Sequence, residues 1–162
     1  MIEKKVKSLT EKNFAPYGQV VTFPEGISID PGAVHGWKVV ANIPYSGEVE
    51  VGWLLLKKRP MDVTQMEHHL NTPEMIIPLD SPFMVPVAPA NEDAAALPNP
   101  QQIEGFIVEP GQALVMDRSG WHWLPFPTKE TGSCLIIFSK DTPAHDLLIK
   151  DLPDGEAVRL IV

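Results

Sequence analysis

Two stretches of the sequence bring together residue types that bind metal ions or transfer protons. In the first, Glu67 and His69 are two residues apart and Glu74 follows shortly after. Residues two apart in a strand point to the same face, so Glu67 and His69 share a face. The turn at 71–73 can fold the chain back and bring Glu74 beside them on the next strand. In the second stretch, His122 lies in another strand, just past a Ser-Gly turn.

These two carboxylates and two imidazoles form a nitrogen–oxygen ligand set for a divalent ion such as Mn, Fe, Co, Ni or Zn. Four protein ligands on an octahedral ion leave two cis positions, which a hydroxy acid or keto acid can fill. The same groups can also act as acids and bases without a metal, because burial raises the pKa of a Glu toward neutral pH. A third interpretation is that His69 and His122 are only half-buried, hydrogen-bonded histidines. We expect no organic cofactor.

The elements that must position these groups are short strands. The 17 prolines among 162 residues are spread along the chain, and one proline inside a helix costs about 3 kcal/mol. This spacing excludes a helical bundle and predicts an all-β sandwich or barrel. We expect a short helix after Thr10, a turn of helix at Glu92–Ala96 and a loop over Ala90–Gln102. The predicted strands are Lys5–Leu9, Gln19–Phe23, Gly36–Ala41, Val49–Leu56, Val63–His68, Met75–Leu79, Phe83–Ala88, Gly105–Val108, Ala113–Asp117, Ser133–Ser139, His145–Leu148 and Ala157–Ile161.

Charge and composition narrow the classes of partner. The formal net charge is −8, from 13 basic and 21 acidic residues. Nucleic-acid binding needs a concentrated basic face, which this chain lacks. A small anionic substrate is compatible with a locally positive pocket. The one cysteine, Cys134, cannot form an internal disulfide, and no run of apolar residues is long enough for a signal peptide or a membrane helix. We therefore expect a single cytoplasmic domain over residues 1–162 without membrane contact.

The spacing of the two stretches resembles the cupin superfamily. Glu67-x-His69-x4-Glu74 is similar to the core of the first cupin motif, with Glu67 at the position of the first His. The stretch from Gly111 to His122 matches the second motif in register, with other residues at its Pro and Gly positions. The resemblance implies a cupin-type double-stranded β-helix, which is a jelly-roll-like barrel, with one or two short helices.

A second set of motifs extends from Leu9 to about Phe138. It consists of Leu9–Val20, Glu67-His68-His69, Ile77-Pro78, Phe83–Ala88, Asn99-Pro100, Phe106, Pro110-Gly111-Gln112 and Arg118-x-x-Trp121-His122 with Pro125. These segments are similar to the ureidoglycolate lyase family, long called ureidoglycolate hydrolase. The sequence departs from the family at His68, where Arg is common, at Trp123, where a second His is common, and at Asp117, where some members carry His.

The family resemblance implies an enzyme of ureide and allantoin catabolism, within purine metabolism, that splits (S)-ureidoglycolate into glyoxylate and urea. It implies catalytic roles for Glu74, His69, His122 and Arg118. Arg118 is the candidate for binding the substrate carboxylate, since a guanidinium group binds a carboxylate in bidentate fashion. Lys57 is a second candidate, and Trp121 would exclude water. The resemblance also implies a homodimer.

Two other functions stay open because the departures from the family pattern touch the site. One is a different cupin enzyme, such as a metal-dependent isomerase or a dioxygenase, that acts on a small hydroxy acid or keto acid. The other is a binding protein for small carboxylates without catalytic activity.

Overall fold

The computed structural model describes residues 1–162 apart from the side chain of Asp154, and its regular structure is mostly β. Two α-helices of four residues each, α1 (Glu11–Phe14) and α2 (Thr142–His145), accompany the strands. No helix in the described part of the chain is long and apolar enough to cross a bilayer. The other elements are β1 (Ile2–Lys5), β2 (Lys7–Ser8), β3 (Gly18–Val21), β4 (Val49–Lys57), β5 (Asp62–Val63), β6 (Gln65–His68), β7 (Glu74–Pro78), β8 (Phe83–Ala88), β9 (Glu104–Val108), β10 (Ala113–Met116), β11 (Trp121–His122), β12 (Phe126–Pro127), β13 (Thr131–Ser139), β14 (Leu148–Asp151), β15 (Val158–Ile161) and the 3₁₀ turns η1 (Pro100–Gln102) and η2 (Pro153–Gly155).

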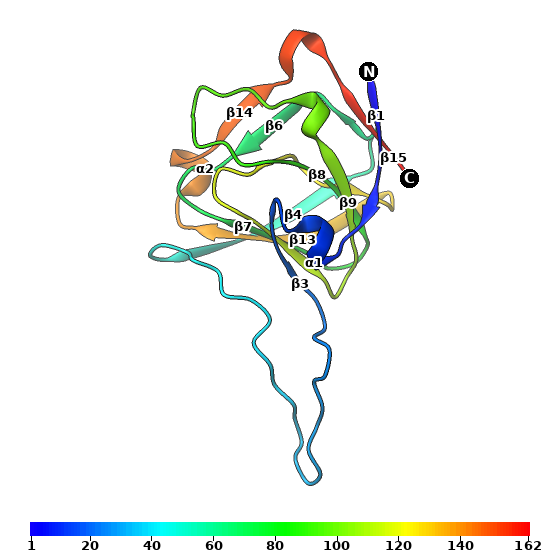
Figure 1. Cartoon of the computed structure of the whole chain (residues 1–162), viewed down its shortest axis with the longest axis vertical. Coiled ribbons are helices and arrows are strands. Elements are labelled where there is room, and N and C mark those ends of the chain that lie inside the picture. Colours follow the sequence, from blue (N-terminus) through cyan, green and yellow to red (C-terminus); the bar gives the residue numbers. More distant parts are fainter.

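The strands form a jelly roll (Figure 1). One sheet has the order β3-β10-β7-β13-β4, and the facing sheet has the order β14-β6-β11-β8-β9-β2. Along the chain, β4, β6, β7 and β8 alternate between the two sheets, and β9, β10, β11 and β13 return to pair with them. This folded-over pairing is the double-sheet arrangement of cupins. The cupin-type barrel predicted from the motifs is therefore confirmed.

A third, small sheet of β1, β15 and β5 covers the outer face of the second sheet. Strand β8 is consequently buried on both faces, and all six of its residues are inaccessible. Phe83 and Val85 point into the core between the two large sheets. Met84 and Ala88 point into the second core, under the small sheet. This alternation decides which side chains of the neighbouring β6 and β11 face the barrel interior.

Most of the predicted strands overlap observed ones, but two predictions are wrong. Residues Gly36–Ala41 form no strand, because they have no neighbouring strand to pair with. The prediction for His145–Leu148 is displaced: α2 ends at His145 and β14 begins at Leu148. Pro143, in the first turn of α2, suits the start of a helix.

The two helix predictions had different outcomes. The helix after Thr10 is confirmed as α1, and Thr10 and Asn13 form a reciprocal capping box at its start. The segment Glu92–Ala96 contains only a hydrogen-bonded turn, from the Ala96 N–H to the Asp93 carbonyl. The loop predicted over Ala90–Gln102 is irregular except for η1.

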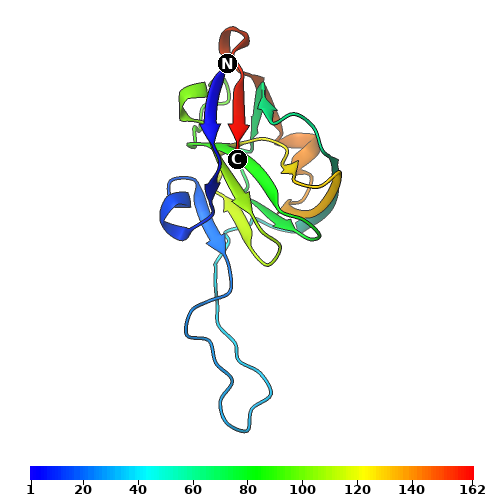
Figure 2. The same cartoon turned by 90° about the vertical axis from the view of Figure 1, so that its right-hand side faces the viewer.

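Residues 22–48, here called the arm, connect β3 to β4 and extend well beyond the barrel (Figures 1 and 2). The arm contains no helix and no strand. Gln19 Nε2 donates to the Asn42 carbonyl, and Tyr45 Oη donates to the Ile137 carbonyl. These two contacts hold the returning end of the arm to the barrel, whereas residues 31–40 are all exposed.

The packing around Gly132 in β13 yields a stability prediction. A Cβ at this position would lie 2.6 Å from Ser81 Oγ and 2.7 Å from Phe83 Cζ. We expect Gly132→Ala to lower the free energy of unfolding by about 1–3 kcal/mol, since overpacking displaces a well-packed core. Urea unfolding measures the change.

The matched control is Gly52→Ala on the paired strand β4, where a Cβ meets only the Ile136 carbonyl oxygen at 3.8 Å. We expect this variant to stay within about 0.5 kcal/mol of the parent protein. Equal stabilities for the two variants would contradict the packing described here.

Candidate active site

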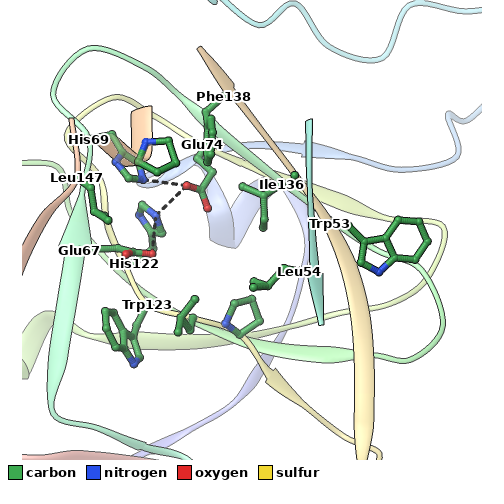
Figure 3. Close-up of a pocket in the computed structure, with 14 residues that line it drawn as sticks. Trp53, Leu54, Glu67, His69, Glu74, His122, Trp123, Ile136, Phe138 and Leu147 are labelled. Atoms are coloured by element: carbon green, nitrogen blue, oxygen red, sulfur yellow. Dashed lines mark hydrogen bonds and ion pairs between the residues drawn. The ribbon is translucent and has the colours of Figure 1, made fainter. Parts of the chain in front are cut away.

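The fold brings the four predicted acid, base or ligand residues together at one end of the barrel interior (Figure 3). Glu67 lies in β6 and pairs directly opposite His122 in β11. His69 follows β6 on the same face as Glu67, and Glu74 is the first residue of β7, after the turn. Strand alternation and the turn at 71–73 therefore place these groups as the sequence predicts.

The four groups line a cavity of about 340 Å³ whose other walls are mostly apolar. Leu54, Ile136 and Phe138 come from β4 and β13, and Trp123 and Leu147 close the opposite side (Figure 3). A site of this kind holds a small molecule by its apolar walls and orients it with a few polar groups.

The carboxylate of Glu74 lies between the two imidazoles. His69 Nε2 is 2.9 Å from Glu74 Oε2, and His122 Nε2 is 3.4 Å from the same oxygen. Glu67 Oε1 lies 3.6 Å from His122 Nε2. His69, Glu74 and His122 are all buried. The contacts form a row from His69 through Glu74 and His122 to Glu67, in a low-dielectric environment.

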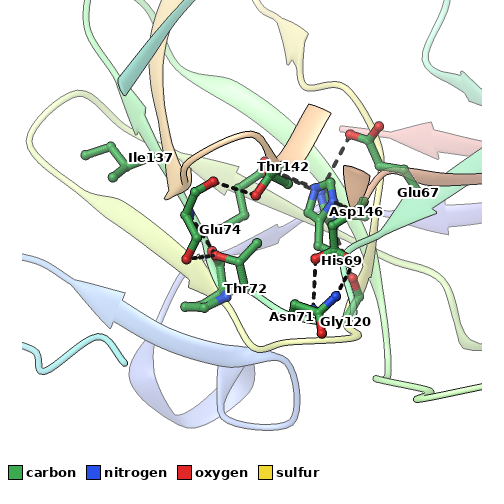
Figure 4. A network of polar contacts seen from close by, with 12 residues as sticks. Glu67, His69, Asn71, Thr72, Glu74, Gly120, Ile137, Thr142 and Asp146 are labelled. Carbon is green, nitrogen blue, oxygen red and sulfur yellow. Dashed lines mark hydrogen bonds and ion pairs between the residues drawn. The ribbon is translucent and has the colours of Figure 1, made fainter. Parts of the chain in front are cut away.

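Backbone carbonyl groups orient both imidazoles (Figure 4). His69 Nδ1 lies 2.7 Å from the carbonyl oxygen of Asp146, and His122 Nδ1 lies 3.0 Å from that of Gly120. A carbonyl only accepts hydrogen bonds, so each Nδ1 carries a proton. Each Nε2 is consequently directed at the carboxylates, as in histidines that bind metal ions or transfer protons.

The surroundings shift the pKa values of these groups in different directions. Burial raises the pKa of Glu67 above its ordinary range. Burial also acts to raise the pKa of Glu74, but the charge of His122 and the hydrogen bond and charge of His69 outweigh it and lower that pKa to about 2. Burial opposes protonation of His122, yet Glu74 and Glu67 raise its pKa to about 9. Glu74 is thus an ionised acid and His122 a protonated base near neutral pH.

The donor set fits a divalent metal ion. One ligand atom each from Glu67, His69 and His122 lies within 4.8 Å of the other two. His122 Nε2 is buried and has no hydrogen-bond partner of good geometry. The buried, ionised carboxylate of Glu74 needs either the proton on His122 or a divalent cation nearby, because unbalanced buried charge is strongly unfavourable.

The other three predicted site residues lie outside this cavity. Arg118 lines a separate depression with Gln19 and Asp117, and Lys57 is exposed at the end of β4. Trp121 precedes His122 in β11, so it points to the second core and stacks on His68 with 3.8 Å between ring centroids. Among the residues that the structure describes, no Lys or Arg lines the cavity.

Sequence reasoning missed Asp146, which holds the loop after β6. Its Oδ1 and Oδ2 accept hydrogen bonds from the backbone N–H groups of Leu70 and Asn71, at 2.9 and 2.8 Å. Its carbonyl oxygen orients His69 (Figure 4). Asp146 lies 77 residues after His69, and no local pattern connects the two positions.

Comparison with known proteins identifies the family. The sequence profile of the ureidoglycolate lyases matches residues 1–154. The chain belongs to the ureidoglycolate lyase family. A ureidoglycolate lyase from Chelativorans sp. (strain BNC1) is 30% identical over 137 residues, which are 80% of each chain.

Solved structures of oxalate decarboxylases are also similar to this ureidoglycolate lyase family member, although weakly. One from Bacillus subtilis is 14% identical with a TM-score of 0.44 over 84% of the present chain and 28% of its own. One from Lactobacillus farciminis is 15% identical with a TM-score of 0.42 over 64% and 26%. The chain thus spans about a quarter of the length of these proteins, and such alignments indicate nothing about its substrate or metal.

The proton balance of the site leads to a prediction for metal binding. If one divalent ion replaces the proton on His122 Nε2, uptake of Mn²⁺ or Zn²⁺ near pH 7 should release about one proton from this group. Calorimetric titration in buffers of different ionisation enthalpy measures this number. We expect His122→Gln to bind the metal more weakly and His35→Gln, an exposed arm variant, to bind it normally. Binding without proton release would contradict the proton assignment.

The raised pKa of His122 predicts how the stability of the metal-free protein depends on pH. A group whose pKa is higher in the folded state stabilises fully below its unfolded pKa, about 6.5, and the stabilisation is lost as the pH rises through about 9. We expect the free energy of unfolding to fall between about pH 7 and 8.5, with a slope up to about 1.4 kcal/mol per pH unit.

Urea unfolding of EDTA-treated protein at several pH values measures this slope. His122→Gln should remove it, and His35→Gln should leave it unchanged. A profile that is flat in this range for the unsubstituted protein would show that His122 is not protonated at neutral pH.

Proposed function

We propose that the protein is a ureidoglycolate lyase that cleaves (S)-ureidoglycolate to glyoxylate and urea in ureide and allantoin catabolism. Membership of the family supports this activity. The observation that carries the proposal is the cluster of Glu67, His69, Glu74 and His122 at the polar end of a small apolar cavity. Its paired acids and imidazoles suit a reaction that moves a proton between two atoms of one small substrate.

The reaction needs one proton removed and one delivered. The central carbon of ureidoglycolate bears a hydroxyl group, a carboxylate and the ureido nitrogen. The bond from carbon to nitrogen breaks while the hydroxyl oxygen loses its proton and becomes the aldehyde oxygen of glyoxylate. The nitrogen takes up a proton and leaves as urea, so no proton is gained or lost overall.

Glu67 and His122 suit these two steps. Glu67 is partly accessible at the cavity, and the pKa of its carboxyl group is raised by burial, so the carboxylate accepts the hydroxyl proton. His122 Nε2 faces the cavity without a hydrogen-bond partner of good geometry, so its proton is available to the leaving nitrogen. Ionised Glu74 keeps a proton on His122 and binds His69.

A divalent metal would be held by Glu67, His69 and His122, and when bound it would act as a Lewis acid that lowers the pKa of the substrate hydroxyl. Binding the metal would occupy Glu67 and His122, so the proton transfers by these two residues belong to the metal-free site. In either state, Glu74 and the two backbone carbonyls orient the imidazoles. Leu54, Ile136 and Phe138 exclude water from the reacting carbon. Their exclusion of water strengthens the electrostatic interactions inside the cavity.

The proposal includes a cytoplasmic enzyme that works as a homodimer on a small-molecule substrate. The lone, buried Cys134 suits a reducing compartment, because it cannot form an internal disulfide. The homodimer rests on the family resemblance.

Release of glyoxylate from racemic ureidoglycolate tests the proposal, with and without added Mn²⁺ or Zn²⁺. We expect turnover by the parent protein and losses in kcat of about 10²- to 10⁴-fold for Glu67→Gln and His122→Gln. Glu109→Gln, a variant of an exposed residue that does not line the cavity, should remain fully active. If the folded parent protein released no glyoxylate under any of these conditions, the proposed activity would be wrong.

A further inference from the structure

The arm exposes large apolar side chains that the barrel leaves uncovered. Phe23 is 78% exposed, Trp37 79% and Val34 91%. Figures 1 and 2 show the arm extending away from both sheets. Exposed apolar surface of this extent on a projecting segment is typical of a protein–protein contact.

The outer face of β4 is apolar as well. Every second residue of this strand points outward, and Val51, Trp53 and Leu55 are 60%, 70% and 66% exposed. β4 is the last strand of its sheet and is hydrogen-bonded only to β13. The strand therefore offers both an uncovered apolar face and a free edge, to which an extended segment of another chain can bind.

The charges on the arm and beside the β4 face are complementary. The arm carries exposed Glu25 and Asp30, and β4 leads into exposed Lys57 and Lys58. At the other end of β4, Glu48 is already paired with Lys140, at 2.7 Å. An arm from a second copy would place acidic residues near this basic end, which favours association and sets its direction.

The apolar area is sufficient for a stable dimer. Ten large apolar side chains on the arm and β4 are exposed in each copy: Phe23, Ile29, Val34, Trp37, Val39, Val40, Val49, Val51, Trp53 and Leu55. If each buries roughly 60–100 Å², two copies together bury on the order of 1,200–2,000 Å², which is the range of specific protein–protein interfaces.

β4 lies between its exposed face and the cavity. Leu54 points into the cavity, whereas the ring of Trp53 points away from it on the other side of the strand (Figure 3), although Gly52 and Trp53 are also among the residues that line the cavity. Because β4 is the edge strand of its sheet, a segment that binds Trp53 and crosses this edge reaches the opening. The proposed substrate is an anion, yet no described residue lining the cavity is Lys or Arg.

Lys38 is the only Lys or Arg in the arm. It stands next to Trp37 in the exposed stretch, and its Nζ donates only to the backbone carbonyl of Glu25 in the same arm, at 2.9 Å. Its charge is therefore not neutralised by a carboxylate, and its long side chain can reach an anion beyond the apolar contact.

We propose that a second copy of the chain lays its arm across the exposed face of β4 and the cavity mouth, where Lys38 of the arm binds the substrate carboxylate. This inference rests on the proposed function for the identity of the anion. Each site is then completed by the other copy, and the arms of a symmetric dimer are exchanged.

The first test is the oligomeric state, measured by sedimentation velocity on the full chain. We expect a dimer for the parent protein and a monomer for Trp53→Glu, which places a charge in the centre of the interface. Since Trp53 is exposed, this variant should keep the fold, as circular dichroism can verify. Leu97→Glu, at an exposed apolar position in another loop, should stay dimeric. A monomeric parent protein, or a dimeric Trp53→Glu variant, overturns the inference.

The second test asks whether the arm of one copy serves the site of the other. Lys38→Ala should lower kcat/KM for ureidoglycolate by about 10- to 100-fold, chiefly through KM, because a charge-assisted hydrogen bond is lost. The exposed lysine variant Lys12→Ala, outside the arm, should have no effect.

Mixed dimers of one Lys38→Ala copy and one His122→Gln copy, isolated by two different affinity tags, then decide the arrangement. If arms are exchanged, the His122→Gln copy completes the site of its partner, and the mixed dimer shows about half of the parent activity. If each arm serves its own copy, no site is intact and activity stays at the level of the two variant homodimers, which overturns the inference. Failure of the proposed function is distinguishable, because the parent protein would then be inactive whatever its oligomeric state.

Discussion

A carboxylate buried between two imidazoles is the interaction on which the site depends. Glu74 is almost inaccessible to solvent, and an unpaired charge there would be strongly unfavourable. His69 and His122 lie 2.9 and 3.4 Å from it, and the compensating charge comes either from protonated His122 or from a divalent cation. The remaining features of this end of the barrel serve to keep these three side chains in contact.

The jelly roll supplies that positioning because it brings distant segments into register. Glu67 and His122 are direct partners of adjacent strands, and the backbone of Asp146 and Gly120 fixes the ring orientation of both histidines. Asp146 contributes twice, since its carboxylate also ties down the loop that carries His69. The acid–base chemistry thus depends on three strands, β6, β7 and β11, and on the segments that carry His69, Gly120 and Asp146. Removing one of the titratable side chains changes the protonation of the others.

The arm takes no part in the packing of the barrel. The barrel fills its two cores without it, and yet the arm carries a large share of the exposed apolar side chains of the chain. Two observations need an explanation: no described Lys or Arg lines the cavity, and the arm exposes apolar side chains. Exchange of arms between two copies explains both. Oligomerisation would then be a requirement for substrate binding and not only a source of stability.

The sequence by itself determined the class of fold and the polar centre of the site. Alternation along a strand places Glu67 and His69 on one face, and a proline-containing turn returns the chain at Glu74. The spacing from Gly111 to His122 matches a cupin motif. All three features depend on short distances along the chain, so they can be predicted from the sequence. Arg118 and Lys57 were predicted because their charges suit a carboxylate, and Trp121 because an apolar wall excludes water. Their side chains lie outside the cavity because a single step along a strand or a turn reverses the direction of a side chain. The strand predicted at Gly36–Ala41 is absent, because an apolar run does not reveal whether a partner strand lies beside it. Only the tertiary structure decided the role of Asp146 and the residues of the apolar walls, since contacts between residues far apart in sequence depend on how the two sheets pack.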